Sequence, residues 1–156
     1  MKNLIGILES MGCVKVKTYI QSGNAIFQHK GNKNAIAEEI SSKILESHGF
    51  KPKVLLLEVS ELEDAVKNNP FKMMEGKSLH FFFLASAPVK PNLDELENIK
   101  SNSEKFKLDK NIFYLYAPDG IGRSKLAVRV EQALGVPVTA RNWNTVSKLI
   151  AMFKQA

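Results

Sequence analysis

Two short stretches in the last third of the chain combine residue types that bind anions. The first, residues 118–126, places two glycines, two cations and a hydroxyl close together: Gly120, Gly122, Arg123, Ser124 and Lys125. The second, residues 140–144, contributes one cation and two amides: Arg141, Asn142 and Asn144. Each stretch is expected to open a helix, where unpaired backbone N–H groups and a partial positive charge favour phosphate and carboxylate. We therefore predict that the two stretches are halves of one anion-binding corner.

The elements around these stretches predict how they come together. Strands are expected over residues 79–84, 104–108, 112–116 and 138–141, and helices over 93–100, 124–134 and from 143 onward. This order is the β-α-β-β-α-β unit of ferredoxin-like folds. Its third and fourth strands are parallel and flank the first, so their ends emerge at one sheet edge, roughly 10 Å apart. The ends in question are Tyr116 and Arg141, which would set the two helix starts side by side.

The first half of the chain repeats this order without a first strand. Helices are expected over residues 1–11, 32–47 and 60–68, and strands over 14–20, 25–28 and 54–59, with a hairpin turn at 22–24. We therefore predict an α+β fold of two tandem ferredoxin-like (α-β plait) halves. The first plait would occupy 1–70, a linker 71–77, and the second plait with a C-terminal helix 78–156.

The strand missing from the first half is a central one in this fold, with spatial order 4-1-3-2. Its absence would leave unpaired backbone groups on both sides of a gap. We expect that the strand lies upstream of residue 1, or that another segment or chain fills the gap. Self-association through this incomplete first sheet is therefore one of the predicted partner modes.

Composition and charge narrow the class of protein. An apolar fraction of 44% and a charged fraction of 24% are typical of a globular protein. Most of the net charge of +6 lies in residues 101–156, which contain nine Lys and Arg residues and four Asp and Glu residues. No apolar run reaches the roughly 18 to 20 residues of a membrane span, so no membrane partner is predicted. The single cysteine, Cys13, excludes an internal disulfide, and because the sequence shows no export signal we expect a cytoplasmic protein. The three histidines stand apart, and we predict neither a metal site nor a cofactor.

Other interpretations of the same residues stay open. The glycines could serve only a sharp turn, and their spacing is not that of a P-loop. Alternatively, a basic plait could stack nucleic-acid bases on sheet aromatics, here Phe82, Phe106, Tyr114 and Tyr116. An enzyme is a third class, but no nucleophile, base and orienting group occur at a telling spacing. The sequence leaves open whether the protein is an enzyme.

Four motifs resemble a bacterial family known as domain-of-unknown-function family sixteen-ninety-seven. They are Thr18–Asn24 (TYIQSGN), Asn69–Phe71 (NPF), Tyr114–Leu126 (YLYAPDGIGRSKL) and Ala140–Val146 (ARNWNTV). The resemblance spans essentially the whole chain and implies a two-plait α/β architecture, with no assigned activity. It also implies that members carry an additional N-terminal strand and an Arg-Gly-Ile-Asn-like turn, which this sequence lacks.

Taken together, these patterns favour a binding module for a phosphate- or carboxylate-bearing ligand. Arg123 and Arg141 would clamp the ligand, above the backbone N–H groups of the two helix starts. The predicted partner is a phosphorylated small molecule or a nucleic acid.

Overall fold

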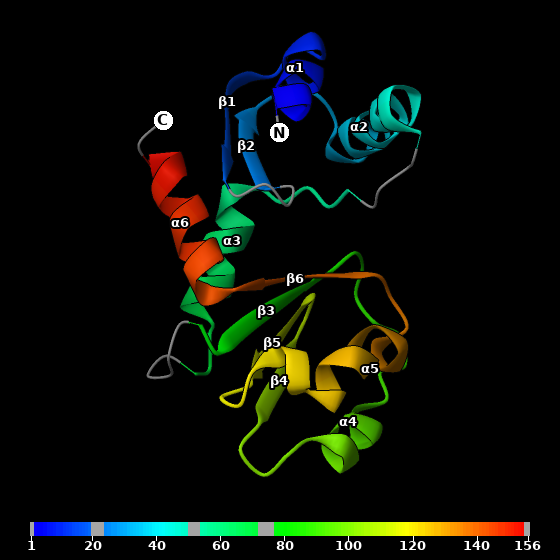
Figure 1. Cartoon of the computed structure of the whole chain (residues 1–156), viewed down its shortest axis with the longest axis vertical. Helices are drawn as coiled ribbons and strands as arrows, with labels where there is room; N and C mark the ends of the chain where they lie inside the picture. The colour runs from blue at the N-terminus through cyan, green and yellow to red at the C-terminus, as the bar shows by residue number, and fades with distance from the viewer. Residues whose placement is uncertain (1, 20–23, 50–53, 72–76, 155–156) are drawn as a thin grey trace. The chain divides into compact units, whose positions relative to one another are not determined.

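The computed structural model describes residues 2–19, 24–49, 54–71 and 77–154. These ranges form a mixed α/β protein with six helices, two sheets and one 3₁₀ turn (Figure 1). The helices are α1 (Lys2–Ser10), α2 (Lys33–His48), α3 (Val59–Lys67), α4 (Leu93–Ile99), α5 (Lys125–Leu134) and α6 (Trp143–Lys154), and the 3₁₀ turn is η1 (Ile121–Arg123). The strands are β1 (Val14–Tyr19), β2 (Asn24–Gln28), β3 (Leu79–Leu84), β4 (Lys105–Asp109), β5 (Ile112–Tyr116) and β6 (Val138–Asn142). The predicted hairpin turn at 22–24 and linker at 71–77 fall mostly outside the described residues.

Cα positions divide the chain into two compact units. The first unit contains residues 1–59 with 148–156, and the second unit contains residues 60–147. The second unit therefore includes nearly all of α3, whereas the sequence assigns that helix to a first plait ending at residue 70. The predicted domain boundaries at residues 70 and 78 concern which segments fold independently, and they stay predictions.

The second unit contains a four-stranded antiparallel sheet in the order β4-β5-β3-β6. Its elements follow one another as β3, α4, β4, β5, α5 and β6, which is the order and the strand arrangement expected for this half. The central strand β3 is buried along its whole length, in keeping with its unbroken apolar run. The tight turn between β4 and β5 places Lys110 at a φ of 55°.

Helices α4 and α5 cover one face of this sheet, where they lie side by side (Figure 1). Alternate residues of β3 and β5 point to this face because side chains alternate along a strand. The core that results contains these buried residues: Phe82, Leu84, Leu96, Phe113, Leu115, Ala117, Leu126, Val130, Ala133 and Leu134. Ile121 of η1 packs against the same core, so the 118–126 stretch is anchored on this face.

The opposite face of the sheet is also covered. Phe81 packs its ring edge-on against Tyr114, at 5.2 Å between centroids, and lies 6.0 Å from the ring of Trp143 at the start of α6. The Tyr114 hydroxyl donates a 2.7 Å hydrogen bond to the backbone carbonyl of Ala65 in α3. Helix α3 and the first turn of α6 therefore belong to the packing of this face.

The first unit contains the two-stranded antiparallel sheet β1-β2 and the helices α1 and α2. Its core joins Leu8, Cys13, Ile36 and Ile40, with Val54 and Leu56 packed against it. The strand predicted over 54–59 is wrong: residues 54–58 have no strand assignment, and Val59 already begins α3. An apolar segment becomes a strand only where a neighbouring backbone completes its ladder, and none does so within the described residues.

Candidate functional site

Strand register brings the two predicted stretches to one edge of the second sheet. Tyr116, the last residue of β5, pairs with Leu79, and Asn142, the last residue of β6, pairs with His80. The first residues of β3 therefore lie between the ends of β5 and β6. Each of these two strands is followed by a helix, η1 and then α5 after β5, and α6 after β6.

The chain after β5 turns sharply at Gly120. This residue has a φ of 101°, a conformation that L side chains rarely adopt, and its N–H donates to the Ala117 carbonyl at 3.1 Å. Arg123 N–H donates back to the Gly120 carbonyl at 3.2 Å, which closes the 3₁₀ turn. A Cβ added at either glycine would meet no atom within 4 Å, but Gly122 is not in the positive-φ conformation that Gly120 adopts. Gly120 thus serves the turn, whereas the turn does not require a glycine at position 122.

Ser124 is the N-cap of α5, and its hydroxyl is occupied within the protein. Its Oγ accepts the N–H of Ala127 at 3.0 Å and donates to the carboxylate of Glu104. Both Ser124 and Glu104 are buried, and the other Glu104 oxygen accepts the N–H of Ser101 at 2.8 Å. A carboxylate of the protein itself therefore lies at the start of α5, where it complements the helix dipole.

A second contact fixes the same region. The Ser103 hydroxyl donates to the carboxylate of Asp119 at 2.6 Å, so residues 101–104 and 119–124 are joined at two points. The sequence interpretation missed Glu104, although the Ser101-x-x-Glu104 spacing is that of a capping box and indicates a side chain that turns back on its own loop.

The stretch after β6 is organised in a similar way. The Asn142 side-chain oxygen accepts the N–H of Thr145 at 2.9 Å, so Asn142 caps α6. Arg141 pairs with Phe81 in the register, which assigns its side chain to the face covered by α3 and the first turn of α6. It is half-buried, its Nη1 donates to the Ala140 carbonyl at 2.7 Å, and burial lowers its pKa. Arg141 and the 118–126 stretch thus belong to opposite faces of the sheet at this edge.

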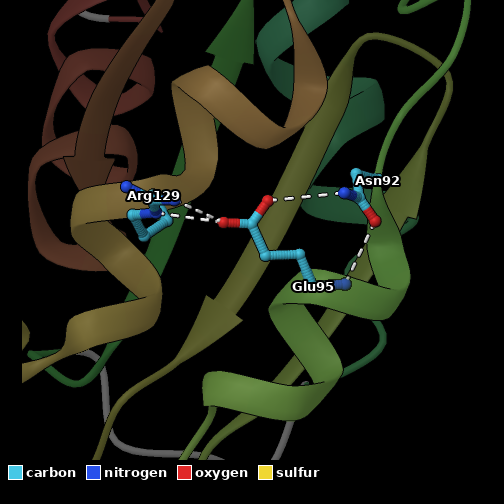
Figure 2. Close-up of polar contacts among 3 residues, drawn as sticks. All are labelled: Asn92, Glu95 and Arg129. Atoms are coloured by element: carbon cyan, nitrogen blue, oxygen red, sulfur yellow. Dashed lines mark hydrogen bonds and ion pairs between the residues drawn. The ribbon is translucent and has the colours of Figure 1, made fainter.

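The remaining predicted site residues lie at the surface. Arg123, Lys125 and Asn144 are exposed, as are the two glycines of the turn. The third arginine, Arg129, is held elsewhere (Figure 2). Its Nε and Nη2 donate to one oxygen of Glu95 at 3.0 and 2.8 Å, and Asn92 of the α4 N-cap bonds the same glutamate. Arg129 therefore joins α5 to α4 and lies outside the predicted corner.

Two of the four aromatics considered for base stacking are buried. Phe82 is 4% exposed and packs under α4 and α5, whereas Tyr114 is 1% exposed on the face that α3 and α6 cover. Phe106 stacks on Phe113 at 5.4 Å between ring centroids. Bases could not reach Phe82 and Tyr114 without displacing helices, whereas Phe106 and Tyr116 are only partly buried.

One buried polar side chain at this edge was not singled out from the sequence. His80, the second residue of β3, is 7% exposed and lies opposite both Leu115 and Asn142. Burial lowers the pKa of its imidazole, which favours the neutral ring. A histidine inside an otherwise apolar strand, in the run Leu79–Leu84, is the sequence signal that could have indicated it.

The described ranges contain neither a candidate membrane span nor a candidate metal site. No helix in them combines the length and apolar character needed to cross a membrane. Nor do they gather three or more His, Cys, Asp or Glu residues in a way that could hold a metal ion.

Comparison with known proteins places the chain in a family without assigning an activity. Residues 1–114 match the family model described as "Protein of unknown function (DUF1697)", and the chain belongs to that family. No curated protein matches the chain. A solved structure, the conserved bacterial protein SP0830 from Streptococcus pneumoniae, superimposes with a TM-score of 0.73 at 21% identity, covering 97% of this chain and 87% of that one. At this identity the likeness shows a shared fold.

Proposed function

We propose that this member of the DUF1697 family is a binding protein for a small ligand that carries a phosphate or carboxylate group. The ligand would bind at the edge of the second sheet, against the turn at residues 120–125. The observation that carries the proposal is the register at the start of β3, which lies between the ends of β5 and β6 and so brings two helix starts to one edge.

The exposed cations give this edge its affinity for anions. Arg123 and Lys125 are both exposed, and the backbone around Gly122 is open to a close approach. The buried carboxylate of Glu104 already complements the first turn of α5 and would repel a second anion in the same position. The ligand anion therefore binds on the Gly122 and Arg123 side of Ser124.

The other predicted site residues have supporting roles in this proposal. Gly120 permits the turn, and the Ser124 and Asn142 side chains cap the helices that flank the ligand. Asn144 is exposed in the first turn of α6 and can donate an amide hydrogen bond. Arg141 contributes charge from the opposite face, so its truncation should weaken binding less than truncation of Arg123.

A thermal-shift screen of inorganic phosphate, glycerol phosphate and nucleotides first selects the compounds that stabilise the protein. Isothermal titration calorimetry with the selected compounds then tests the proposal. Arg123→Ala with Lys125→Ala should weaken binding at least tenfold, because two charge-assisted contacts are lost. Lys90→Ala with Lys107→Ala removes the same charge from exposed positions outside the turn and should bind as the unmodified protein does. Equal losses in both double variants would indicate a general effect of charge and contradict the proposed site.

We also propose that the first unit follows the same plan as the second, as an α-β plait without its central strand. The antiparallel β1-β2 pair followed by α2 and the apolar residues 54–57 supports this plan. Residues 54–58 would then run parallel to β2 at two strand spacings, roughly 10 Å away. Backbone NMR contacts showing direct pairing of residues 54–58 with β2 would contradict it.

A further inference from the structure

His80 is a polar side chain in an apolar setting. It precedes the aromatic run of β3, and its neighbour across the sheet on β5 is Leu115, which belongs to the core under α4 and α5. Residues that pair directly across antiparallel strands share a face of the sheet. The imidazole therefore lies on the face that carries η1 and the start of α5, at the edge where the ligand is proposed to bind.

The hydrogen bonding of His80 is incomplete. No hydrogen bond joins its ring nitrogens to the described residues, although the residue as a whole is only 7% exposed, and these nitrogens are not among the fully buried atoms that lack a partner. The polar residue directly across from it on β6 is already engaged, since the Asn142 side chain accepts the Thr145 N–H. A ring nitrogen that solvent still reaches and that no protein group pairs is available to water or to a ligand oxygen.

We infer that His80 is the inner contact of the ligand site, where its ring N–H donates to an oxygen of the bound phosphate or carboxylate group. This inference rests on the proposed function. The inferred site has two layers. Arg123 and Lys125 attract the anion at the surface, and the His80 imidazole below them donates a hydrogen bond to one oxygen of the anion. A neutral imidazole suits this position because it offers one donor without adding a second buried charge.

The depth of His80 also restricts the class of ligand. A side chain with 7% exposure is reached only by a narrow group. A terminal phosphate, as in a sugar phosphate or a mononucleotide, or a terminal carboxylate meets this condition. The phosphodiesters of a nucleic-acid duplex do not, because each phosphate is bonded to a sugar on both sides and cannot enter a narrow opening as a terminal group.

The test compares His80→Phe with His29→Phe, using inorganic phosphate and glycerol phosphate as probes in calorimetry. Phenylalanine suits position 80, since its neighbours Phe82 and Leu115 are apolar. His29 is the matched control because its ring is already satisfied: Nδ1 accepts the Gly31 N–H at 2.7 Å and Nε2 donates to the Met11 carbonyl at 3.0 Å. We expect His80→Phe to raise Kd about tenfold or more and His29→Phe to leave it unchanged.

A second readout uses the folded, unmodified protein. The imidazole nitrogen signals of His80 should shift on phosphate titration, whereas those of His29 should not, so the result does not depend on the stability of a variant. Unchanged affinity in His80→Phe together with unmoved His80 signals would overturn the inference. If the double variant Arg123→Ala with Lys125→Ala still abolished binding while the His80 results were negative, the proposed function would hold without the role inferred for His80. No binding of either probe to the unmodified protein would overturn both.

Discussion

At the scale of single residues, the sheet edge contains side chains that the fold has already engaged and others that it leaves exposed. Ser124 and Asn142 are helix caps, and the Glu104 carboxylate binds the Ser124 hydroxyl at the start of α5. Arg123 and Lys125 remain at the surface. Fewer of the predicted residues are therefore exposed than the sequence pattern indicates.

The two glycines of the turn should respond differently to alanine. Gly120→Ala places a Cβ at a φ of 101° and should lower the free energy of unfolding by about 1 kcal/mol or more. Gly122→Ala meets no atom within 4 Å and should leave stability unchanged or slightly raised. If the ligand approaches the backbone at Gly122, that second variant should still bind phosphate more weakly.

Urea unfolding of both variants, followed by calorimetry with phosphate, makes this comparison. Equal destabilisation by the two substitutions would show that the turn needs both glycines. Full binding by Gly122→Ala would place the ligand elsewhere on this edge.

His80 should make stability depend on pH. Burial lowers the pKa of its imidazole below the ordinary value of 6.5, so the unfolded chain binds a proton more readily than the folded protein does. The free energy of unfolding should therefore fall as pH drops below about 6.5, by at most about 1.4 kcal/mol per pH unit from this one group. Urea unfolding at pH 7.5 and pH 5 should show a smaller acid loss in His80→Phe than in the unmodified protein. The same acid loss in both proteins would show that other groups cause it.

At the scale of elements, α4 is a short helix whose start is fixed by one residue. Asn92 accepts the Glu95 N–H at 3.1 Å, and Glu95 in turn binds Arg129 of α5 (Figure 2). Asn92→Ala should cost about 1 kcal/mol, because an N-cap hydrogen bond is lost. Arg129→Ala should cost less, about 0.2 to 1 kcal/mol, because the Arg129 and Glu95 side chains are 47% and 27% exposed and water screens the pair.

Thermal and urea unfolding of the two single variants tests that order. Added salt should reduce the effect of Arg129→Ala and leave that of Asn92→Ala nearly unchanged. A larger cost for the arginine variant would contradict the assignment of the cap as the main support of α4.

Much of the second unit could be predicted from its sequence. The alternation and turn residues of 79–142 lead to the observed strands, and the order β4-β5-β3-β6 follows from the unit they form. The first unit was harder to predict, since the apolar run at 54–58 has the composition of a strand but no assigned ladder. Glu104 was missed because its partner, Ser124, lies 20 residues away in the sequence. His80 was missed because its neighbours are set by the strand register. Local pattern marks both residues as unusual, through a capping-box spacing and a histidine in an apolar strand, but it does not identify their partners.

At the scale of the whole molecule, α3 should decide where a stable fragment begins. The Tyr114 hydroxyl bonds the Ala65 carbonyl, and the Cα-based unit starts at residue 60. A fragment of residues 59–156 should therefore unfold cooperatively. A fragment of residues 78–156 should lose that transition, because the face with Phe81 and Tyr114 would be uncovered.

Circular dichroism with thermal unfolding of the two fragments distinguishes these boundaries. If residues 78–156 alone unfolded as cooperatively as 59–156, the domain boundary predicted from the sequence would hold and α3 would be dispensable.

The double connection between residues 101–104 and 119–124 has a consequence for the thermodynamics of recognition. Ser124 with Glu104 and Ser103 with Asp119 join segments that are 20 and 16 residues apart, so the turn has lost much of its conformational entropy on folding. A ligand that binds such a preorganised turn has little backbone left to order. Association should then bring only a small change in heat capacity, unlike the large negative change that accompanies folding of a segment around its ligand.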